Sequence, residues 1–388
     1  MKNKFYIVLR TALPVIGIII GGAKIFGAPG EVQLFSQLGV SNGFRIVFGI
    51  LQAVCGIVII VPELELTGII SSAALLIVAV SLMISHHLFA VAAVPLLGIA
   101  TLLIFAYCRK AWEKSLPFKD KIIIVTGGGA GIGRSLCKEL GRRGAQVIVA
   151  GRTMTGVNEV VSNIRAAGGR AEAVEMDVSK ETDVQNGIDK VVSKYGRLDY
   201  IINNAGINIA GEMRDLKTEH FQEVIDINLR GTLYGTMAAY RVMIKQGFGH
   251  IVNMSSLAGL IPFPANIPYT TTKHAIVGLS TALRAEAKAL GVKVSVACPG
   301  LIMTDIWKKT RMMKASNEDM LNMIGERIML DVKSTTRMIL NGVCRNQAII
   351  TFPMHANAMW WFYRLSPSTF APVGKIIMYM FRKIRKNG

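Results

Sequence analysis

The sequence has little charge, few cysteines and few histidines, and each shortage excludes a class of protein. Only 18% of its 388 residues are charged, whereas soluble domains carry about 25%. The five cysteines form no C-x-x-C pair, which predicts reduced thiols and speaks against a disulfide scaffold or a zinc ribbon. The only adjacent histidines are His86 and His87, whose side chains would point about 100° apart on a helix. We therefore predict no metal site.

Acidic residues are also scarce, so the net charge is +19. Such a balance suits nucleic acid, an anionic membrane surface or a nucleotide as partner. Residues 301–388 alone hold 14 Lys or Arg and 5 Asp or Glu, a net of +9. No nucleic-acid motif accompanies this basic tail, so we predict no nucleic-acid partner.

The end of the tail, residues 353–388, combines clustered aromatic residues with the basic residues Arg382, Lys383, Arg385 and Lys386. It is too short and too basic for a membrane span. The pattern predicts an amphipathic helix that lies on anionic membrane lipids. A packed C-terminal helix in a dimer interface is the alternative.

Long apolar runs fill the first third of the chain. A hydrocarbon core about 30 Å thick needs about 20 apolar residues per helix. Four runs approach this length, with turn signals or charges in the gaps between them: Tyr6–Phe26, Phe44–Val61, Leu66–Ile84 and His87–Cys108. They predict an all-α four-helix transmembrane bundle over residues 1–110, followed by a linker at 111–118.

Positive charge predicts the orientation of this bundle. Lys and Arg flank its two ends, at Lys2, Lys4 and Arg10 before it and at Arg109, Lys110, Lys114, Lys119 and Lys121 after it. The turn between the third and fourth runs has none. Because such residues favour the cytoplasmic side, we predict a multi-pass membrane protein whose remaining residues lie in the cytoplasm.

Residues 5–108 resemble the DoxX-like family of small four-helix membrane proteins. The matching pieces are GGAKIFG at the end of the first run, LGV at 38–40 and Pro62 after the second run. Gly21, Gly22 and Gly27 fit close packing between helices equally well.

A nucleotide-binding pattern follows the bundle. Lys121–Thr126 is a β-branched run typical of a central parallel strand. It leads into T-G-x-x-x-G-x-G, formed by Thr126, Gly127, Gly131 and Gly133, and a helix begins at once. Glycines let the backbone approach a pyrophosphate, which the helix N-terminus attracts.

The end of the next strand, Gln146–Ala150, indicates which dinucleotide binds. Dinucleotide folds often place an acidic residue there for the ribose, but this chain has Gly151 and then Arg152. A guanidinium can pair with a 2′-phosphate, so we predict NADP(H) rather than NAD(H). A solvated surface arginine is the alternative.

Later strands also end in polar or turn residues, separated by helical stretches. These ends are Asp177, Asn203–Gly206, Ser255–Ser256 and Pro299–Gly300. Strands that alternate with helices predict an α/β fold, a Rossmann-type doubly wound parallel sheet with its ligands at the strand C-termini. We place this domain at residues 119–352.

A tyrosine–lysine pair indicates proton transfer. Tyr269 and Lys273 are spaced i, i+4 in a helical stretch, Tyr269–Leu290, so they share a face. A phenol has a pKa near 10, and a nearby ammonium is expected to lower it. A strand that ends in Ser255–Ser256 shortly before this pair strengthens the interpretation.

The region Lys119–Thr304 resembles the short-chain dehydrogenase/reductase family. The matching pieces stand in family order: TGGGAGIG at 126–133, Asp177, NNAG at 203–206, Asn228, Ser256, YTTTK at 269–273, PG at 299–300, and Thr304. The resemblance implies that Tyr269 transfers the proton and that Lys273 binds the ribose and lowers the Tyr269 pKa. It also implies that Asn228 holds a water and that Ser256 contacts the carbonyl oxygen. We prefer Ser256 to Ser255 for this role because neighbours on a strand face opposite ways. The resemblance also implies a cofactor site made of Thr126, Gly127, Gly131, Ile132, Gly133, Arg152, Asp177, Asn204, Ala205, Gly206, Tyr269, Lys273, Pro299, Gly300 and Thr304.

Two functions fit these observations. The first is a membrane-tethered NADP(H)-dependent oxidoreductase whose lipophilic alcohol or carbonyl substrate is a sterol, a retinoid or a long-chain keto-lipid. It rests on the apolar segments before Tyr269 and after Gly300, for which ordinary lid packing is the alternative. In the second, the bundle carries the main function and the reductase domain senses NADP(H) or serves a quinone. The intact Ser–Tyr–Lys set favours the first, and a homodimer or homotetramer stays open.

Overall fold

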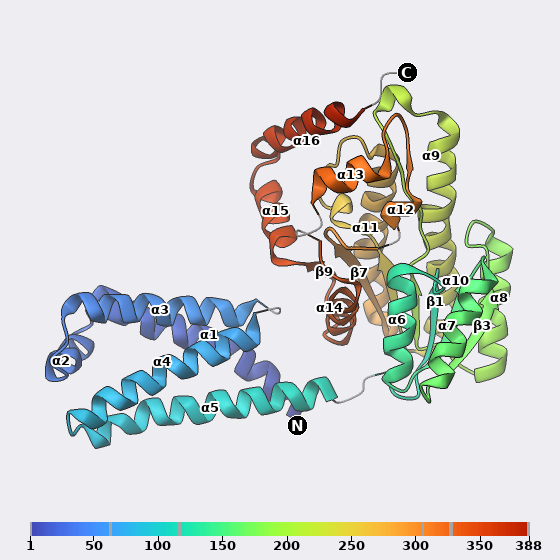
Figure 1. Ribbon diagram of the computed structural model, residues 1–388. Helices are drawn as coiled ribbons and strands as arrows, with labels where there is room; N and C mark the ends of the chain where they lie inside the picture. Colours follow the sequence, from blue (N-terminus) through green and yellow to red (C-terminus); the bar gives the residue numbers. More distant parts are fainter. Residues whose placement is uncertain (1, 62–63, 115–117, 305, 326–328, 386–388) are drawn as a thin grey trace. The chain divides into compact units, whose positions relative to one another are not determined.

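The computed structural model describes residues 2–61, 64–114, 118–304, 306–325 and 329–385. The chain forms two compact units, Met1–Leu116 and Pro117–Gly388 (Figure 1). Residues 115–117 of the predicted linker, and Pro62 of the DoxX-like pattern, lie outside the described residues.

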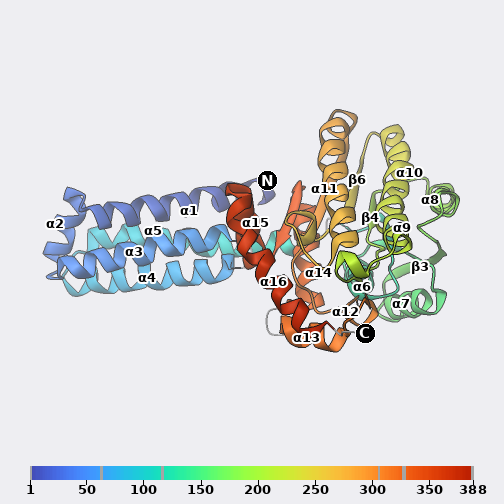
Figure 2. The same cartoon turned by 90° about the horizontal axis from the view of Figure 1, so that it is seen from above.

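The first unit is a bundle of long helices that run side by side (Figure 2). Four helices are long and apolar enough to cross a membrane by length and composition, and they coincide with the four predicted runs. The fifth, α2, is short and was expected to be a turn. The helices are α1 (Lys2–Phe26), α2 (Pro29–Gln37), α3 (Asn42–Ile60), α4 (Glu65–Ser85) and α5 (Phe89–Lys114).

Glycines allow α1 and α3 to pack closely. A β-carbon on Gly21 would lie 2.6 Å from the carbonyl oxygen of Gly49, so no other residue fits there. Gly22 has open space around it, and Gly27 follows the end of α1 with φ +74°. Of the three glycines in the GGAKIFG pattern, therefore, only Gly21 is required by helix packing.

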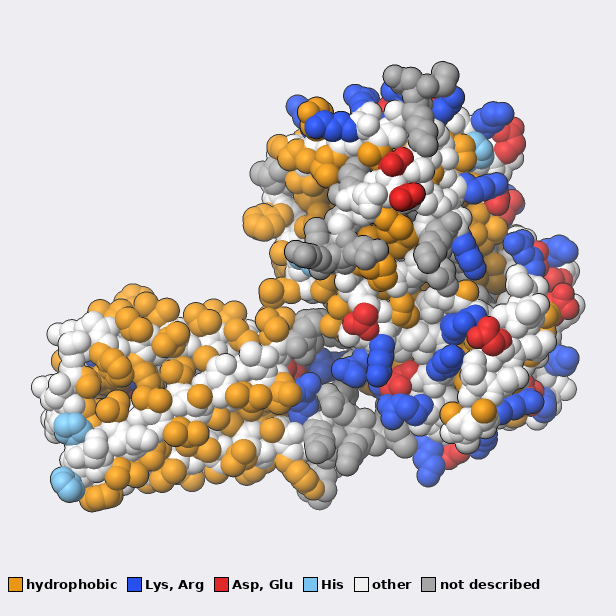
Figure 3. Space-filling model, in the orientation of Figure 1, with side chains coloured by type: hydrophobic (Ala, Val, Ile, Leu, Met, Phe, Trp, Pro, Cys, Tyr) orange, Lys and Arg blue, Asp and Glu red, His pale blue; other side chains and the backbone are white. Residues whose placement is uncertain are grey.

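The outer surface of this unit is apolar, while its charges gather near the helix ends (Figure 3). Val94 and Leu97 are about 70% exposed on α5. In contrast, Glu65 is 1% exposed and lies 3.2 Å from the guanidinium of Arg10. An apolar exterior around buried ion pairs is the arrangement expected of helices in lipid.

The second unit is built on a parallel sheet with strand order β3-β2-β1-β4-β6-β7-β9. Its strands are β1 (Ile122–Thr126), β2 (Gln146–Gly151), β3 (Arg170–Glu175), β4 (Tyr200–Asn203), β6 (Gly249–Met254), β7 (Val292–Pro299) and β9 (Ile349–Phe352). β1 is buried along its whole length, as its β-branched run predicts. The predicted Rossmann-type sheet is confirmed, although β9 was not foreseen.

Helices cover both faces of the sheet (Figure 1). One layer contains α6 (Gly131–Arg142), α7 (Met154–Ala166) and α14 (Val332–Cys344). The other contains α8 (Glu181–Tyr195), α10 (Gly231–Gln246) and α11 (Ile267–Ala287). Each layer buries its own apolar cluster against the sheet, so the strand ends are held rigidly.

The remaining elements of this unit are short or lie beside the C-terminal strand ends. A second, two-stranded sheet pairs β5 with β8. These elements are β5 (Ile209–Ala210), α9 (Thr218–Val224), a π-helical turn (Ile225–Arg230), α12 (Ile306–Lys309), β8 (Arg311–Met312), α13 (Asn317–Ile324), α15 (Met354–Leu365) and α16 (Ala371–Ile384).

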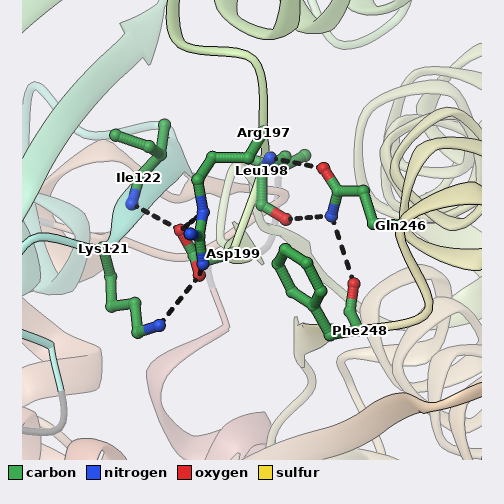
Figure 4. Close-up of polar contacts among 7 residues, drawn as sticks. All are labelled: Lys121, Ile122, Arg197, Leu198, Asp199, Gln246 and Phe248. Carbon is green, nitrogen blue, oxygen red and sulfur yellow. Dashed lines mark hydrogen bonds and ion pairs between the residues drawn. The ribbon is translucent and has the colours of Figure 1, made fainter.

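A buried carboxylate links residues at the starts of β1 and β4 (Figure 4). Asp199 is 3% exposed and accepts a hydrogen bond of 3.0 Å from the backbone N–H of Ile122. Lys121 and Arg197 pair with the same carboxylate. Gln246 holds the adjacent turn by accepting from Leu198 N–H at 2.8 Å.

Candidate functional site

The glycine-rich turn connects β1 to α6 and is shaped for a ligand. Gly127 and Gly131 have φ of +62° and +51°, which favours glycine. A β-carbon on Gly131 would meet nothing nearer than the Thr304 β-carbon at 3.9 Å, so this side of the turn is open. A β-carbon on Gly133 would lie 2.3 Å from the Gly127 carbonyl oxygen, so this glycine lets the helix pack against the turn.

Two predicted residues support this turn from behind. Thr126 is buried, and its hydroxyl accepts from the backbone N–H groups of Asn204 and Ala205 at 3.0 and 3.1 Å. The Asn204 amide donates back to the Thr126 carbonyl at 3.0 Å. Thr126 and Gly133 are therefore the two predicted cofactor residues that fall outside the cavity lining.

A cavity of about 590 Å³ lies in front of the turn. Every other predicted cofactor residue lines it: Gly127, Gly131, Ile132, Arg152, Asp177, Asn204, Ala205, Gly206, Tyr269, Lys273, Pro299, Gly300 and Thr304. Its described lining also includes Arg134 and Lys309, which the sequence did not single out. The lining thus has four cationic side chains and one carboxylate: Arg134, Arg152, Lys273, Lys309 and Asp177. Together with the open glycine turn, this set fits a dinucleotide that carries phosphates.

The two arginines near the turn differ in their partners. Arg134 is engaged, because its guanidinium donates to both carboxylate oxygens of Glu159 at 3.1 Å and to the Gly129 carbonyl at 3.0 Å. Arg152 is exposed and forms no ion pair within the part of the chain described. Arg152 is thus the guanidinium available to an anion at this end of the cavity.

Asp177 lies near Arg152 at the end of β3. Burial alone would raise the pKa of Asp177, but hydrogen bonds from Ser179 and the charge of Arg152 lower it below its ordinary value. The side chain accepts from the Ser179 hydroxyl at 2.7 Å and from the Ser179 N–H at 3.1 Å. Asp177 is therefore a fixed, ionised acceptor beside the cavity.

Tyr269 and Lys273 project from the first turns of α11, and Ser256 follows β6. The Lys273 ammonium lies 5.3 Å from the centre of the Tyr269 ring and donates to the Met254 carbonyl at 2.8 Å. The side chain of Ser256 is close enough to Tyr269 to lower the pKa of the phenol. The hydroxyl of Ser255 donates instead to the backbone carbonyl of Lys273 at 2.8 Å, so it braces the helix.

The expected lowering of the Tyr269 pKa is not found. Burial raises the pKa of Tyr269 to about 12, and the hydrogen bond from Ser256 offsets only part of this. The same burial lowers the pKa of Lys273 to about 8. Removal from water disfavours both charged forms, and here it outweighs the attraction between ammonium and phenolate.

Asn228 lies behind Lys273 in the π-helical turn, a feature often found at functional sites. Its side chain is fully buried, accepts from Ile207 N–H at 2.8 Å and donates to the Ile207 carbonyl at 2.9 Å. A longer bond of 3.4 Å reaches the Thr272 hydroxyl. The amide thus fixes the turn after Gly206 against α11, and the implied bound water stays a prediction.

The far end of the cavity is walled by residues that sequence reasoning did not name individually. Phe263, Asn266, Ile306 and Trp307 line it. The Trp307 indole donates to the Ile302 carbonyl at 2.7 Å, which fixes the ring. The sequence signals for this wall were the near absence of charge in residues 257–268 and the many Met, Leu and Ile residues in 301–330.

Known proteins resemble this unit in sequence. The family model described as short chain dehydrogenase matches residues 121–315. An uncharacterized oxidoreductase of Staphylococcus epidermidis is 31% identical over 192 residues, which cover 50% of this chain and 82% of that protein. The probable oxidoreductase EphD of Mycobacterium tuberculosis is 37% identical over 190 residues, which cover 49% of this chain and 32% of that protein.

Solved structures share the fold. A short chain dehydrogenase/reductase from Burkholderia phymatum in complex with NAD has a TM-score of 0.60 at 24% identity, and the match covers 65% of this chain and 95% of that chain. The 3-ketoacyl-(acyl-carrier-protein) reductase from Brucella melitensis complexed with NADH has a TM-score of 0.54 at 24% identity, with coverages of 60% and 97%.

Proposed function

The chain belongs to the short chain dehydrogenase family of oxidoreductases, and from this premise we propose a specific reaction. The protein interconverts a lipophilic alcohol and its carbonyl compound with NADP(H), while the apolar bundle tethers it to a membrane. The observation that carries the proposal is the grouping of Ser256, Tyr269 and Lys273 in one cavity with the open glycine turn and Arg152.

The cofactor would occupy the glycine turn at one end and reach Tyr269 at the other. Gly131 and the N-terminus of α6 would hold the diphosphate, Arg152 the 2′-phosphate, and Lys273 the nicotinamide ribose. Bound nicotinamide supplies or accepts the hydride. Arg152 is suited to its part because it is exposed and unpaired among the described residues, whereas Arg134 is held by Glu159.

The protein's own residues transfer the proton in this reaction. In the reductive direction, the Tyr269 phenol gives its proton to the carbonyl oxygen as negative charge develops there. The Ser256 hydroxyl donates a hydrogen bond to the same oxygen. The Lys273 ammonium stabilises the phenolate that remains. A proton from solvent then restores the Tyr269 phenol. A pKa of about 12 keeps Tyr269 protonated and ready to donate at neutral pH.

The apolar far wall supports a lipophilic substrate. Phe263, Leu257 and Ile306 line the same cavity as Tyr269, and these side chains offer a substrate contact area with little hydrogen bonding. A membrane tether fits such a substrate, because the enzyme then works at the surface where the substrate is concentrated. The resemblance of residues 5–108 to DoxX-like proteins accords with this anchoring role.

Titrating wild type and two arginine variants with NADPH and NADH tests the cofactor assignment. We expect wild type to prefer NADPH, and Arg152→Ala to lose about tenfold or more in NADPH affinity while keeping its NADH affinity, because it loses a charge-assisted bond to the phosphate. Arg134→Ala is the matched control. It should affect both cofactors equally, since Arg134 supports the turn. Equal NADPH and NADH affinities in wild type would refute the assignment.

A further inference from the structure

A second hollow, of about 940 Å³, adjoins the substrate end of the cavity. Its two walls come from the loop before Tyr269 and from the C-terminal helices α15 and α16. We call it the apolar groove, and its main lining residues are Pro262, Phe263 and Ile267 on one wall and Tyr363, Phe370 and Met378 on the other.

The groove and the catalytic cavity are adjacent. Phe263 lines both. Thr270, the neighbour of the proposed proton donor Tyr269, also lines the groove, and its hydroxyl donates to the Phe263 carbonyl at 3.3 Å. A chain that leaves the catalytic cavity past Phe263 therefore enters the groove directly.

Ion pairs hold the outer wall in place. Arg382 on α16 donates to Glu212 at 3.1 Å, and Arg385 donates to both carboxylate oxygens of Asp215 at 2.8 and 2.9 Å. These arginines keep the pKa of Glu212 and of Asp215 below its ordinary value, so both acids are ionised at neutral pH. The helix is thus anchored at its basic end and presents its apolar side to the groove.

Exposed apolar side chains also lie on α15 and α16, the helices that form the outer wall of the groove. Hydrophobic side chains gather over α15 and α16 (Figure 3). Trp361, Leu365 and Tyr379 are 56%, 80% and 63% exposed. Large exposed apolar surfaces mark contacts with apolar partners, and Lys375 and Lys383 on α16 are positioned to meet an anionic lipid surface.

We propose that the groove holds the hydrocarbon chain of the substrate, so that the substrate is a single-chain amphiphile whose oxygen-bearing carbon reaches Tyr269. This inference rests on the proposed function and refines its substrate class. A compact ring system would occupy the catalytic cavity and leave the groove empty, whereas an unbranched chain uses both.

Gly374 on α16 offers a direct test, because it lines the groove and a β-carbon there would meet nothing within 4 Å. The β-carbon of a tryptophan at this position therefore meets no steric clash, and its ring would reduce the free volume of the groove. Gly278 on α11 is a matched control, since it also has open space and is exposed away from both hollows. The full chain is assayed in phosphatidylcholine–phosphatidylglycerol vesicles with methyl tridecyl ketone and methyl ethyl ketone.

We expect Gly374→Trp to lower kcat/KM for the long ketone by about tenfold or more, because the chain must pack against a misplaced ring. The rate with methyl ethyl ketone should stay unchanged, and Gly278→Trp should change neither. An equal loss with both ketones, or no loss with either, would overturn the groove assignment. Wild type that reduces neither ketone would instead count against the proposed function.

A second measurement needs no turnover. A methyl tridecyl ketone with a photoreactive diazirine at its chain end should crosslink to groove residues such as Tyr363 and Met378, and Gly374→Trp should abolish these crosslinks. Crosslinks confined to other parts of the chain would overturn the proposal even if the enzyme were inactive with every ketone.

Discussion

At the scale of single residues, burial decides the chemistry of the site. Tyr269 and Lys273 lie where an ammonium could activate a phenol, yet desolvation raises the pKa of Tyr269 to about 12 and lowers that of Lys273 to about 8. The phenol is protonated at neutral pH, so it can act as the acid in carbonyl reduction. Alcohol oxidation needs the phenolate, which is scarce at neutral pH.

The raised pKa of Tyr269 and the lowered pKa of Lys273 predict how the rates depend on pH. In the oxidative direction kcat/KM should rise about tenfold per pH unit across the neutral and mildly alkaline range, because the phenolate fraction rises that steeply below the pKa. In the reductive direction it should stay flat up to about pH 7 and fall at higher pH, because Lys273, with a pKa of about 8, has lost half of its charge at pH 8. Initial rates in both directions from pH 6 to about 9 check this. A flat oxidative profile would show that Tyr269 is not the base.

The sequence predicts some site residues well and others not at all. The i, i+4 spacing of Tyr269 and Lys273 and the alternation of Ser255 and Ser256 are local, so they could be read directly. The far wall could not, because Phe263 and Trp307 line the same cavity only after segments distant in sequence pack together. The raised Tyr269 pKa was missed for the same reason, since desolvation depends on the whole surrounding fold.

At the scale of elements, the two ends of the strands have different roles. The C-terminal strand ends line the cavity, whereas the strand starts hold a buried polar cluster that stabilises the fold. Asp199 fixes the starts of β1 and β4 through Ile122, Lys121 and Arg197. The N–H of Ile122 is left without its acceptor if this carboxylate is removed. The cluster lies at the edge opposite the cavity, so it affects the fold rather than the chemistry.

Replacing Asp199 should therefore destabilise the second unit without altering the cavity. We expect Asp199→Ala to lower the free energy of unfolding by about 2–4 kcal/mol, because a buried hydrogen-bonded charge cluster loses its centre. Asp226→Ala removes an exposed pair with Arg230 and should cost less than about 1 kcal/mol. Urea titration in detergent micelles measures both. Equal costs would show that the buried cluster has no special role.

Element prediction succeeded where the local pattern was strong. The β-branched run at β1 and the long apolar helices were read correctly. β9 was missed because Ile349–Phe352 is a four-residue edge strand whose pairing with β7 is non-local. α2 was missed because Pro29 and Gly30 signal a turn, whereas Pro29 instead begins the helix.

At the scale of the whole molecule, the long apolar helices and the cation-lined cavity belong to different units. Four helices of the first unit could cross a membrane by length and composition. The second carries a parallel sheet, a cation-lined cavity and the exposed apolar surface of α15 and α16. The anchoring that we propose would keep the second unit near a lipid surface, where a single-chain amphiphile is concentrated.

The central claim is that Tyr269 performs the proton transfer for a membrane-borne carbonyl compound. The most direct measurement compares wild type with Tyr269→Phe in lipid vesicles, using NADPH and methyl tridecyl ketone, with NADPH affinity measured in parallel. We predict a fall in kcat of about 10² to 10⁴-fold, since general acid catalysis is worth that much, with NADPH affinity nearly unchanged because the phenol faces the substrate. A Tyr269→Phe protein that reduces the ketone at close to the wild-type rate would contradict the account.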